Sequence, residues 1–474
     1  MRLSKGIKAS AVYTIASFIT KGISFITVPI FTRMMPPEEI GVSTTFASWM
    51  SIIGVIAALG INTGAYNIAL KEFKNQRDRY ASSCLAITSA ASILIGIIYL
   101  IFFNDINSFV GLSWQLMVLM IIGFIVQPAN DIWMMRQRFE YRYFAPSFVS
   151  VGTAFVSATL AVIFVSMAKN NGITELGTIK TFSTYIVYDL VALVLFVLLV
   201  SKRNAGVEKQ FVVFALKVSL PMMIHSLAKH ILDASDKIMI QKMVGNSAVG
   251  IYGTLYSLSS LSLIFWNAIN ASLVPYMFSY LADKEEGRKR INAVLFPVFL
   301  FYGLIAIMLA LVSPELVRII APPEYSEAIY LMPPVAAGIF FTSVYNIMAN
   351  ILLYHKQSLK IMAATLAAAL INIVLNYFFI RKFGYIAAAY TTLFANLFLS
   401  VSQYLMARIQ HGKLPFNERM IWILGLIVMI MILLCNILYE YIRIRYAVIV
   451  LSIIMIVINR DFFIDIIKKV IVRQ

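Results

Sequence analysis

One predicted membrane-spanning helix, between Lys217 and Lys237, contains many ionisable side chains. These residues are His225, Lys229, His230, Asp233, Asp236 and Lys237. An ionisable group at membrane depth costs about 2.5–3.5 kcal/mol on insertion scales, so several in one span indicate a polar interior rather than lipid contact. We therefore expect this helix to line a hydrated pathway.

Two predicted spans carry polar stripes at helical spacing. In the first span the stripe is formed by Ser10, Thr14, Ser17, Lys21 and Ser24. In the seventh it is formed by His225, Lys229, Asp233 and Asp236. Fixed cations beside hydrogen-bonding groups suit the binding of an anionic group in a hydrated cavity.

Each charged residue also has a structural interpretation. Lys229 and Asp233 are four residues apart and could simply neutralise one another. Lys21 has no carboxylate three or four residues away. It therefore needs either a distant partner, such as Asp189 in the sixth span, or an anionic ligand, and we favour the ligand.

The remaining ionisable residues leave similar choices. For Asp236 beside Lys237 we favour a pair at the helix end over a binding role. His225 and His230 are either packed histidines satisfied by a hydroxyl or proton carriers. The carboxylates predicted to bind a coupling ion are Asp189, Asp233 and Asp236.

Asparagines occur in pairs in the later spans. Their spacings are three or four residues: Asn267 and Asn270, Asn346 and Asn350, and Asn372 and Asn376. Interhelical hydrogen bonds average about 0.6 kcal/mol in membranes, so helix association explains most of them. The first two pairs, with Ser17, are our candidates for lining a polar cavity.

The composition places the chain in a membrane. Of its 474 residues, 61% are hydrophobic and 13% are charged, which is too apolar for a soluble domain. Fourteen apolar stretches have the length of about 20 residues that crosses a bilayer. They run over residues 10–32, 42–61, 81–103, 114–135, 146–168, 180–201, 215–240, 248–280, 292–313, 327–353, 358–381, 384–408, 420–440 and 443–460.

The net charge of +17 comes mainly from basic residues that concentrate in alternate loops, and this distribution does not indicate nucleic-acid binding. Of the 39 lysines and arginines, 26 lie in one alternating set of loops, including 71–79, 136–142 and 202–209, and 9 lie in the other set. Because basic residues concentrate on the cytoplasmic side, the first set and both termini are predicted to be cytoplasmic. We expect no nucleic-acid partner.

Several classes of protein are not supported. The first apolar stretch is a full span without a small-residue cleavage site, so we predict no cleavable signal peptide. Cys84 and Cys435 lie inside spans and suit neither a disulfide framework nor a zinc site, and we interpret them as packing residues. There is no glycine-rich phosphate loop, and loops between spans are under about 20 residues. We predict no cofactor, no metal and no enzymatic activity.

The chain repeats itself after 209 residues. Without gaps, this shift pairs Lys8 with Lys217, Ser10 with Ser219, Arg33 with Lys242, Met34 with Met243 and Gly41 with Gly250. The first span thus corresponds to the seventh, and Lys21 corresponds to His230. Repeats six spans apart are typical of transporters built from two bundles with the substrate between them. Chance matching of apolar segments is the alternative.

Four further segments stand in order along the chain. They are Thr32–Gly41 with its Pro-x-Glu-x-Gly pattern, Ser235–Ile240, Gly250–Tyr252 and Asn372–Ala389. Together they resemble the polysaccharide exporters of the multidrug/oligosaccharidyl-lipid/polysaccharide (MOP) flippase superfamily, and most closely the O-antigen flippases of the Wzx type. The resemblance extends from about residue 8 to residue 408.

This resemblance implies an all-α polytopic membrane protein with two pseudo-symmetric six-helix bundles in a V-shaped, MATE-like transporter fold. The expected bundles are residues 1–210 and 211–410, followed by an additional helix pair in 411–474. Members of the family often have twelve spans, so about 14 spans would be a departure.

The resemblance also implies a flippase of the bacterial inner membrane. Its substrate would be undecaprenyl-diphosphate-linked oligosaccharide repeat units of O-antigen or a similar surface polysaccharide, moved from the cytoplasmic to the periplasmic leaflet. Lys21, Lys229, His225 and His230 would form a cationic cavity for the diphosphate. Coupling to H+ or Na+, and contacts with membrane lipid, a polysaccharide polymerase and a chain-length regulator, are further expectations.

Two alternatives remain open. A drug/cation antiporter of the same superfamily would favour acidic or aromatic cavity residues, which Lys21 and Lys229 count against. An oligosaccharide polymerase or ligase would carry a long periplasmic loop, whereas the predicted loops are short.

Overall fold

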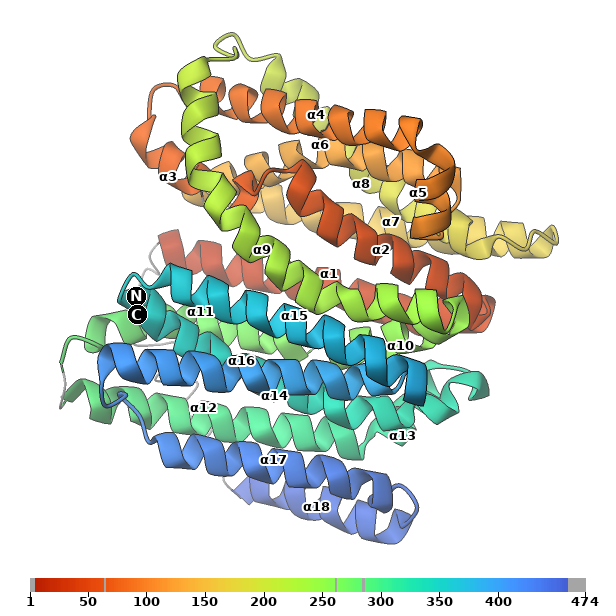
Figure 1. Ribbon diagram of the computed structural model, residues 1–474, viewed down its shortest axis with the longest axis vertical. Coiled ribbons are helices and arrows are strands. Elements are labelled where there is room, and N and C mark those ends of the chain that lie inside the picture. Colours follow the sequence, from red (N-terminus) through yellow and green to blue (C-terminus); the bar gives the residue numbers. More distant parts are fainter. Residues whose placement is uncertain (1–4, 64, 261, 284–285, 459–474) are drawn as a thin grey trace. The chain divides into compact units, whose positions relative to one another are not determined.

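The computed structural model describes residues 5–63, 65–260, 262–283 and 286–458, and within these ranges it contains helices and no strand. Contacts divide the chain into two compact units, Met1–Gly250 and Ile251–Gln474. The first unit contains α1 (Lys5–Met34), α2 (Pro37–Ala57), η1 (Ile61–Thr63), α3 (Ala65–Glu72), α4 (Arg77–Ile101), α5 (Phe103–Val110), α6 (Trp114–Phe139), α7 (Phe144–Asn170), α8 (Leu176–Val200), α9 (Lys209–Met243) and the start of α10 (Asn246–Ser259) (Figure 1).

The second unit continues from α10 into a further set of helices. These are α11 (Ser262–Tyr280), α12 (Glu286–Leu311), α13 (Ser313–Ile320), η2 (Pro323–Leu331), α14 (Met332–Tyr354), α15 (Ser358–Phe383), α16 (Ala387–His411), α17 (Glu418–Leu438) and α18 (Ile442–Ile458). Within the described residues, each of the fourteen predicted stretches overlaps helical structure, and residues 459 and 460 of the last stretch lie outside the described residues. By length and composition, 11 helices in the described part of the chain can cross a membrane.

Two stretches predicted as single spans are divided in the structure. The stretch 248–280 forms α10 and α11, and serine side chains at and just after the end of α10 bond to backbone carbonyls of that helix. Ser259 Oγ donates to the Leu255 carbonyl at 3.1 Å, and Ser260 Oγ donates to that of Ser257 at 2.8 Å. The stretch 327–353 lies partly in the 3₁₀ helix η2 and partly in α14. The predicted all-α fold is confirmed, while the number of spans stays a prediction.

The 209-residue repeat appears in both boundaries and packing. Three boundaries recur at this spacing: the ends of α1 and α9 (Met34, Met243), the starts of α2 and α10 (Pro37, Asn246) and the starts of α4 and α12 (Arg77, Glu286). In the first unit, α6 packs against α4 and α8, and α8 packs against α7. In the second unit, α14 packs against α12 and α16, and α16 packs against α15 (Figure 1). Each unit therefore has the same packing order.

A reciprocal glycine contact joins α2 to the start of α10 within the first unit. A Cβ atom on Gly41 would lie 2.0 Å from the carbonyl oxygen of Asn246, and one on Gly250 would lie 1.9 Å from that of Pro37. The two contacts are equivalent under the repeat. Small residues allow membrane helices to approach closely, and glycine is required at both positions because any larger side chain would meet the backbone of the other helix.

One end of the first unit gathers three basic loops. Arg136 of α6 pairs with Asp78 of α4, and Lys202 Nζ, after α8, lies 2.8 Å from the same carboxylate. Arg79 Nη1 lies 2.7 Å from Glu208 Oε1 at the start of α9. Loops 71–79, 136–142 and 202–209 therefore lie at one end, as the alternation of basic loops requires.

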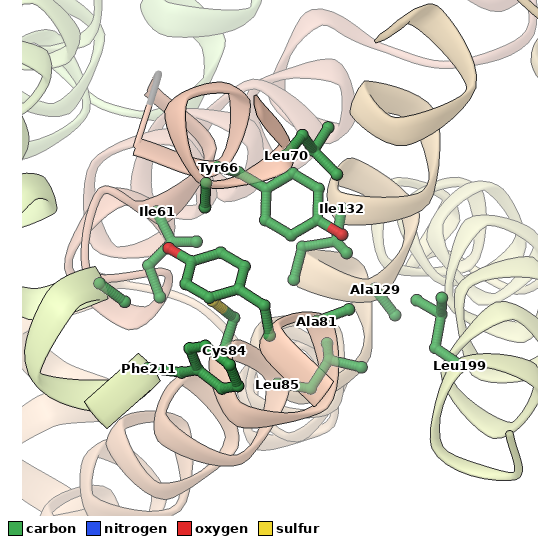
Figure 2. Close-up of a cluster of buried hydrophobic side chains, with 13 residues drawn as sticks. Ile61, Tyr66, Leu70, Ala81, Cys84, Leu85, Ala129, Ile132, Leu199 and Phe211 are labelled. Atoms are coloured by element: carbon green, nitrogen blue, oxygen red, sulfur yellow. The ribbon is translucent and has the colours of Figure 1, made fainter. Parts of the chain in front are cut away.

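The same end contains an aromatic core. Figure 2 shows Tyr66, Cys84, Leu199 and Phe211 converging from α3, α4, α8 and α9, and all are buried. Cys84 is a free thiol here, as is the buried Cys435 in the second unit. Both cysteines thus pack as apolar residues, and this core fixes the ends of the helices that the ion pairs join.

The glycine contact predicts that an added methyl group destabilises the protein at Gly41 but not at Gly152. Gly41→Ala is expected to destabilise the protein by about 1–3 kcal/mol, since the new Cβ atom collides with backbone. Gly152→Ala, in the middle of α7 with no atom within 4 Å of the added Cβ, is expected to be neutral or stabilising by up to about 1 kcal/mol. Thermal unfolding of the purified variants measures both, and equal stability of the two variants would contradict the contact.

Candidate functional site

Helix α9 carries its charged residues as two neighbouring pairs. Lys229 Nζ lies 3.4 Å from Asp233 Oδ2, and about half of each side chain is exposed (51% and 52%). One turn later, Lys237 Nζ lies 3.2 Å from Asp236 Oδ1 and donates a hydrogen bond to the Asp233 carbonyl at 2.7 Å. The carboxylates of the predicted stripe are therefore both paired with lysines of the same helix.

The two pairs differ in burial. Asp236 is buried beside Lys237, so this pair satisfies a carboxylate inside the packed unit. The exposed pair of Lys229 and Asp233 contributes about 0–1 kcal/mol. It can therefore open toward a ligand at small cost, whereas the buried pair cannot.

The two histidines of α9 are only partly covered. His225 and His230 are both half-buried. The Nδ1 atom of His225 is buried and has no hydrogen-bond partner within the described ranges. A ligand or a water molecule could therefore form a hydrogen bond with this ring nitrogen of the α9 stripe.

Helix α1 has two exposed faces of opposite character. The exposed residues of the predicted polar stripe are Ser17, Lys21 and Ser24. The exposed apolar residues are Ile15, Ile19 and Ile26. At about 100° per residue, these two sets lie on roughly opposite sides of the helix. Isoleucines suit lipid, whereas a lysine among serines needs water or a polar ligand, so α1 has the pattern of a helix between lipid and a hydrated pathway.

Lys21 and Asp189 are not brought together. Lys21 is exposed and has no carboxylate partner in the described part of the chain. Asp189 of α8 is only 3% exposed, and its Oδ1 accepts a hydrogen bond from Gln127 Nε2 of α6 at 2.9 Å. Its Oδ2 is buried without a partner among the same residues. Asp189 is thus a buried carboxylate with half of its hydrogen-bonding capacity unused.

The four candidate asparagines lie in the second unit and differ in surroundings. Asn350 Nδ2 of α14 donates to Asn270 Oδ1 of α11 at 2.9 Å, which links two helices. Asn346 Nδ2 donates to the Thr342 carbonyl of its own helix at 2.8 Å. Asn267 is exposed. Of the four, Asn267 has the side chain most accessible to a ligand.

The polar partners in α6 were missed from the sequence. Gln127 bonds to Asp189, and Asp131, one turn later, accepts a hydrogen bond from Asn62 Nδ2 at 2.8 Å. Both α6 residues lie inside the apolar stretch 114–135. A polar residue within a span usually has a polar partner, which is the signal that could have identified them.

The asparagine motif in Asn372–Ala389 packs helices together. Asn376 Nδ2 donates to Asn372 Oδ1 at 3.0 Å, and Asn372 Nδ2 donates to Thr392 Oγ1 of α16 at 3.3 Å. Thr391 of α16 donates to Asn376. This buried network ties α15 to α16, so the residues that carried this part of the resemblance have a structural role.

Comparison with known sequences identifies the family. Residues 7–281 match the profile of a family described as polysaccharide biosynthesis protein. The chain belongs to this family. The profile of the MatE family also matches residues 221–378. Membership of the MOP flippase superfamily, predicted from the four segments, is confirmed.

One relative of this family member aligns over most of its length. The chain is 21% identical over 392 residues to the probable low-salt glycan biosynthesis flippase Agl15 of Haloferax volcanii, covering 80% of this chain and 78% of the relative. The name of this relative describes a probable flippase of glycan biosynthesis, and the description of the family likewise refers to polysaccharide biosynthesis.

Solved structures show the same fold. The lipid II flippase MurJ in an inward closed conformation superposes with a TM-score of 0.69 at 13% identity, covering 96% of this chain and 100% of MurJ. A MATE family multidrug resistance transporter in an inward-facing conformation gives a TM-score of 0.60 at 14% identity, covering 84% and 94%. The predicted MATE-like transporter fold is confirmed. Agl15, MurJ and the MATE protein are flippases and transporters, in agreement with the prediction that the chain is not an enzyme.

The two faces of α1 give a labelling prediction. Ser17→Cys and Ser24→Cys are expected to react with a water-soluble maleimide in the membrane-embedded protein. Ile19→Cys and Ile26→Cys should react roughly tenfold more slowly or less, because the reactive thiolate needs water. The native cysteines are both buried, so the parent protein provides a low background. Equal labelling of the two faces would show that α1 does not border a hydrated pathway.

Proposed function

We propose that this protein is a flippase for lipid-linked oligosaccharides. It translocates undecaprenyl-diphosphate-linked repeat units of O-antigen or a similar surface polysaccharide from the cytoplasmic to the periplasmic leaflet by alternating access. Family membership and the name of the Agl15 relative support the substrate class. The observation that carries the proposal is the exposed polar face of α1, with Lys21 at its centre and no carboxylate beside it among the described residues.

A lipid-linked oligosaccharide would need such a polar face. A diphosphate and sugar hydroxyls must cross hydrocarbon, and fixed cations with hydroxyl groups replace their lost hydration. Lys21 would contact the diphosphate, with Ser17 nearby on the same face. Lys229, His225 and His230 would extend the cationic surface of the first unit. In the second unit, the exposed Asn267 is a separate candidate for contacts with sugar hydroxyls.

We also propose that Asp189 binds the coupling ion, and we favour a proton over sodium. A buried carboxylate with one oxygen unpartnered among the described residues is a suitable proton acceptor, because protonation removes an uncompensated charge from a dry site. The neighbour of Asp189 Oδ1 is the donating amide nitrogen of Gln127. Asp233 and Asp236 are weaker candidates because each has a lysine within 3.4 Å or less.

The proposed setting is the bacterial inner membrane with both termini cytoplasmic. The gathering of loops 71–79, 136–142 and 202–209 at one end supports this orientation through the positive-inside rule. The bundles would be residues 1–210 and 211–410, with 411–474 as an added helix pair, of which residues 459–474 lie outside the described residues. A polysaccharide polymerase and a chain-length regulator would act on the translocated product.

A drug/cation antiporter is the second candidate, favoured by the MatE profile match over residues 221–378. An antiporter for organic cations would be hindered by an exposed lysine such as Lys21, whereas a diphosphate carrier would depend on it. Substitution of Lys21 therefore separates the two functions.

Lys21→Ala is expected to reduce translocation roughly tenfold or more, since a charge-assisted contact is lost. Lys21→Arg should retain activity because the charge remains. Surface glycan display in a deletion strain and flipping of a fluorescent lipid-linked oligosaccharide in proteoliposomes measure both variants at matched protein level. Wild-type glycan display with Lys21→Ala would remove this residue from the site, and increased drug export would favour the antiporter.

Asp189→Asn tests ion coupling, because an amide cannot titrate but fits the same space beside Gln127. In proteoliposomes, the wild-type rate should depend on an imposed pH gradient, and the variant rate should be low and insensitive to it. Asp105→Asn, an exposed carboxylate of α5, serves as the matched control and should behave as wild type. A gradient response that survives in Asp189→Asn would exclude Asp189 as the proton carrier.

A further inference from the structure

The first unit contains a basic cavity that is not lined by any of the proposed transport residues. Its volume is about 330 Å³, and it lies where the end of α6 meets the end of α8. Arg136, Arg142 and Lys202 line it together with Trp133, Leu198 and Leu199. Small-molecule sites begin at about this size.

The charges around the cavity do not balance. Glu140, which also lines it, is shared by Arg136 at 3.1 Å and Arg142 at 3.3 Å, and it is approached by Arg77 at 3.4 Å. The adjacent Asp78 is shared by Arg136 and Lys202. Four cations therefore meet two carboxylates, which leaves the network two positive charges in excess.

The cationic groups differ in how firmly they are held. The side chain of Arg136 is 18% exposed and contacts both carboxylates, so it is fixed by the network. The side chains of Arg142 and Lys202 are 69% and 37% exposed. These two can turn toward an anion without breaking the core of the network.

One wall of the cavity is apolar and continues into an exposed apolar surface of α8. Leu199 belongs to the buried aromatic core, so that wall is rigid (Figure 2). Leu198 is 57% exposed and ends a row of exposed apolar residues on α8. The other members of this row are Leu190, Leu193, Val194 and Val197. An anion held by the arginines would thus have an apolar track for an attached hydrocarbon chain.

We propose that this cavity binds the phosphate headgroup of a membrane lipid. Arginine guanidinium groups bind phosphate in a bidentate fork, and lysine adds a mobile charge. Basic pockets between membrane helices recognise anionic headgroups in this way. The lipid is either an anionic phospholipid of the bilayer or a polyprenyl-diphosphate carrier. The inference does not depend on the proposed translocation activity.

Tryptophan fluorescence of the full-length protein in nanodiscs tests the site, because Trp133 lies in its wall. The probe is phosphatidylglycerol with brominated acyl chains, which quench a nearby indole, compared with brominated phosphatidylcholine at the same fraction. The signal of Trp133 is obtained by subtracting that of Trp133→Phe. Phosphatidylglycerol is expected to quench at a fraction roughly tenfold lower than phosphatidylcholine.

The double variant Arg142→Gln/Lys202→Gln should lose this preference, and Arg142→Lys/Lys202→Arg should keep it. Arg203→Gln is the matched control, since Arg203 is the exposed neighbour of Lys202, lies outside the cavity and forms no ion pair in the described ranges. Equal thermal stability of all variants in phosphatidylcholine shows that each is folded. If the charge-keeping variant also loses the preference, or if phosphatidylglycerol and phosphatidylcholine quench the wild type equally, the site does not exist.

A second arm identifies the source of the phosphate. Unlabelled undecaprenyl diphosphate is added to nanodiscs that contain brominated phosphatidylglycerol. Relief of Trp133 quenching at low molar fraction assigns the cavity to the diphosphate carrier, and unchanged quenching assigns it to bilayer phospholipid. Wild-type flipping by Lys21→Ala would contradict the proposed transport site but would leave both quenching results intact, so the two proposals are tested separately.

Discussion

Hydrocarbon offers no hydrogen bonds, and the polar residues of this chain are arranged around that constraint. A polar group inside a membrane helix must find a polar partner or face water. Asn372 and Asn376 bond with threonines of α16, and Asp236 pairs with Lys237. Lys21 differs from these buried and paired residues, because its side chain is exposed and lies beside serines. The polar groups thus divide into those that assemble the helices and those that remain available to a substrate.

Duplication explains much of the rest of the fold. The order α4, α6, α8, α7 in the first unit recurs as α12, α14, α16, α15 in the second. Within the first unit, Gly41 and Gly250 make the same contact in both directions, against Asn246 and Pro37. A reciprocal contact of this kind is expected when two copies of one element pack through the same surface. Because of this contact, neither glycine can be replaced by a residue with a side chain without a collision with the backbone of the other helix.

The basic end of the first unit combines a rigid core with a mobile rim. Tyr66, Leu199 and Phe211 fix the helix ends, and Arg136 is held between Asp78 and Glu140. Outside that frame, Arg142 and Lys202 retain freedom to move. Half-buried ion pairs of this type stabilise little by themselves, because desolvation offsets much of the attraction. Their excess positive charge makes this end suited to an anionic membrane surface.

The sequence by itself determined the membrane setting, the helical segments, the repeat and the grouping of basic loops. These features depend on local properties: the length of apolar runs, the helical period and the count of lysines and arginines. It also placed His225, Lys229 and Asp233 on one stripe, because residues three and four apart share a helix face. Sequence similarity in four short segments was enough to indicate the family.

Only the tertiary structure decided which of those faces are covered. Periodicity showed that Ser17 and Lys21 share a face, but packing determined that this face is exposed while Asp189 is buried against Gln127. The bond between Asn270 and Asn350 likewise depends on two helices 80 residues apart becoming neighbours. Helical period is a property of adjacent residues, whereas burial and pairing depend on which helices meet, and for that reason the partners could not be derived from the sequence.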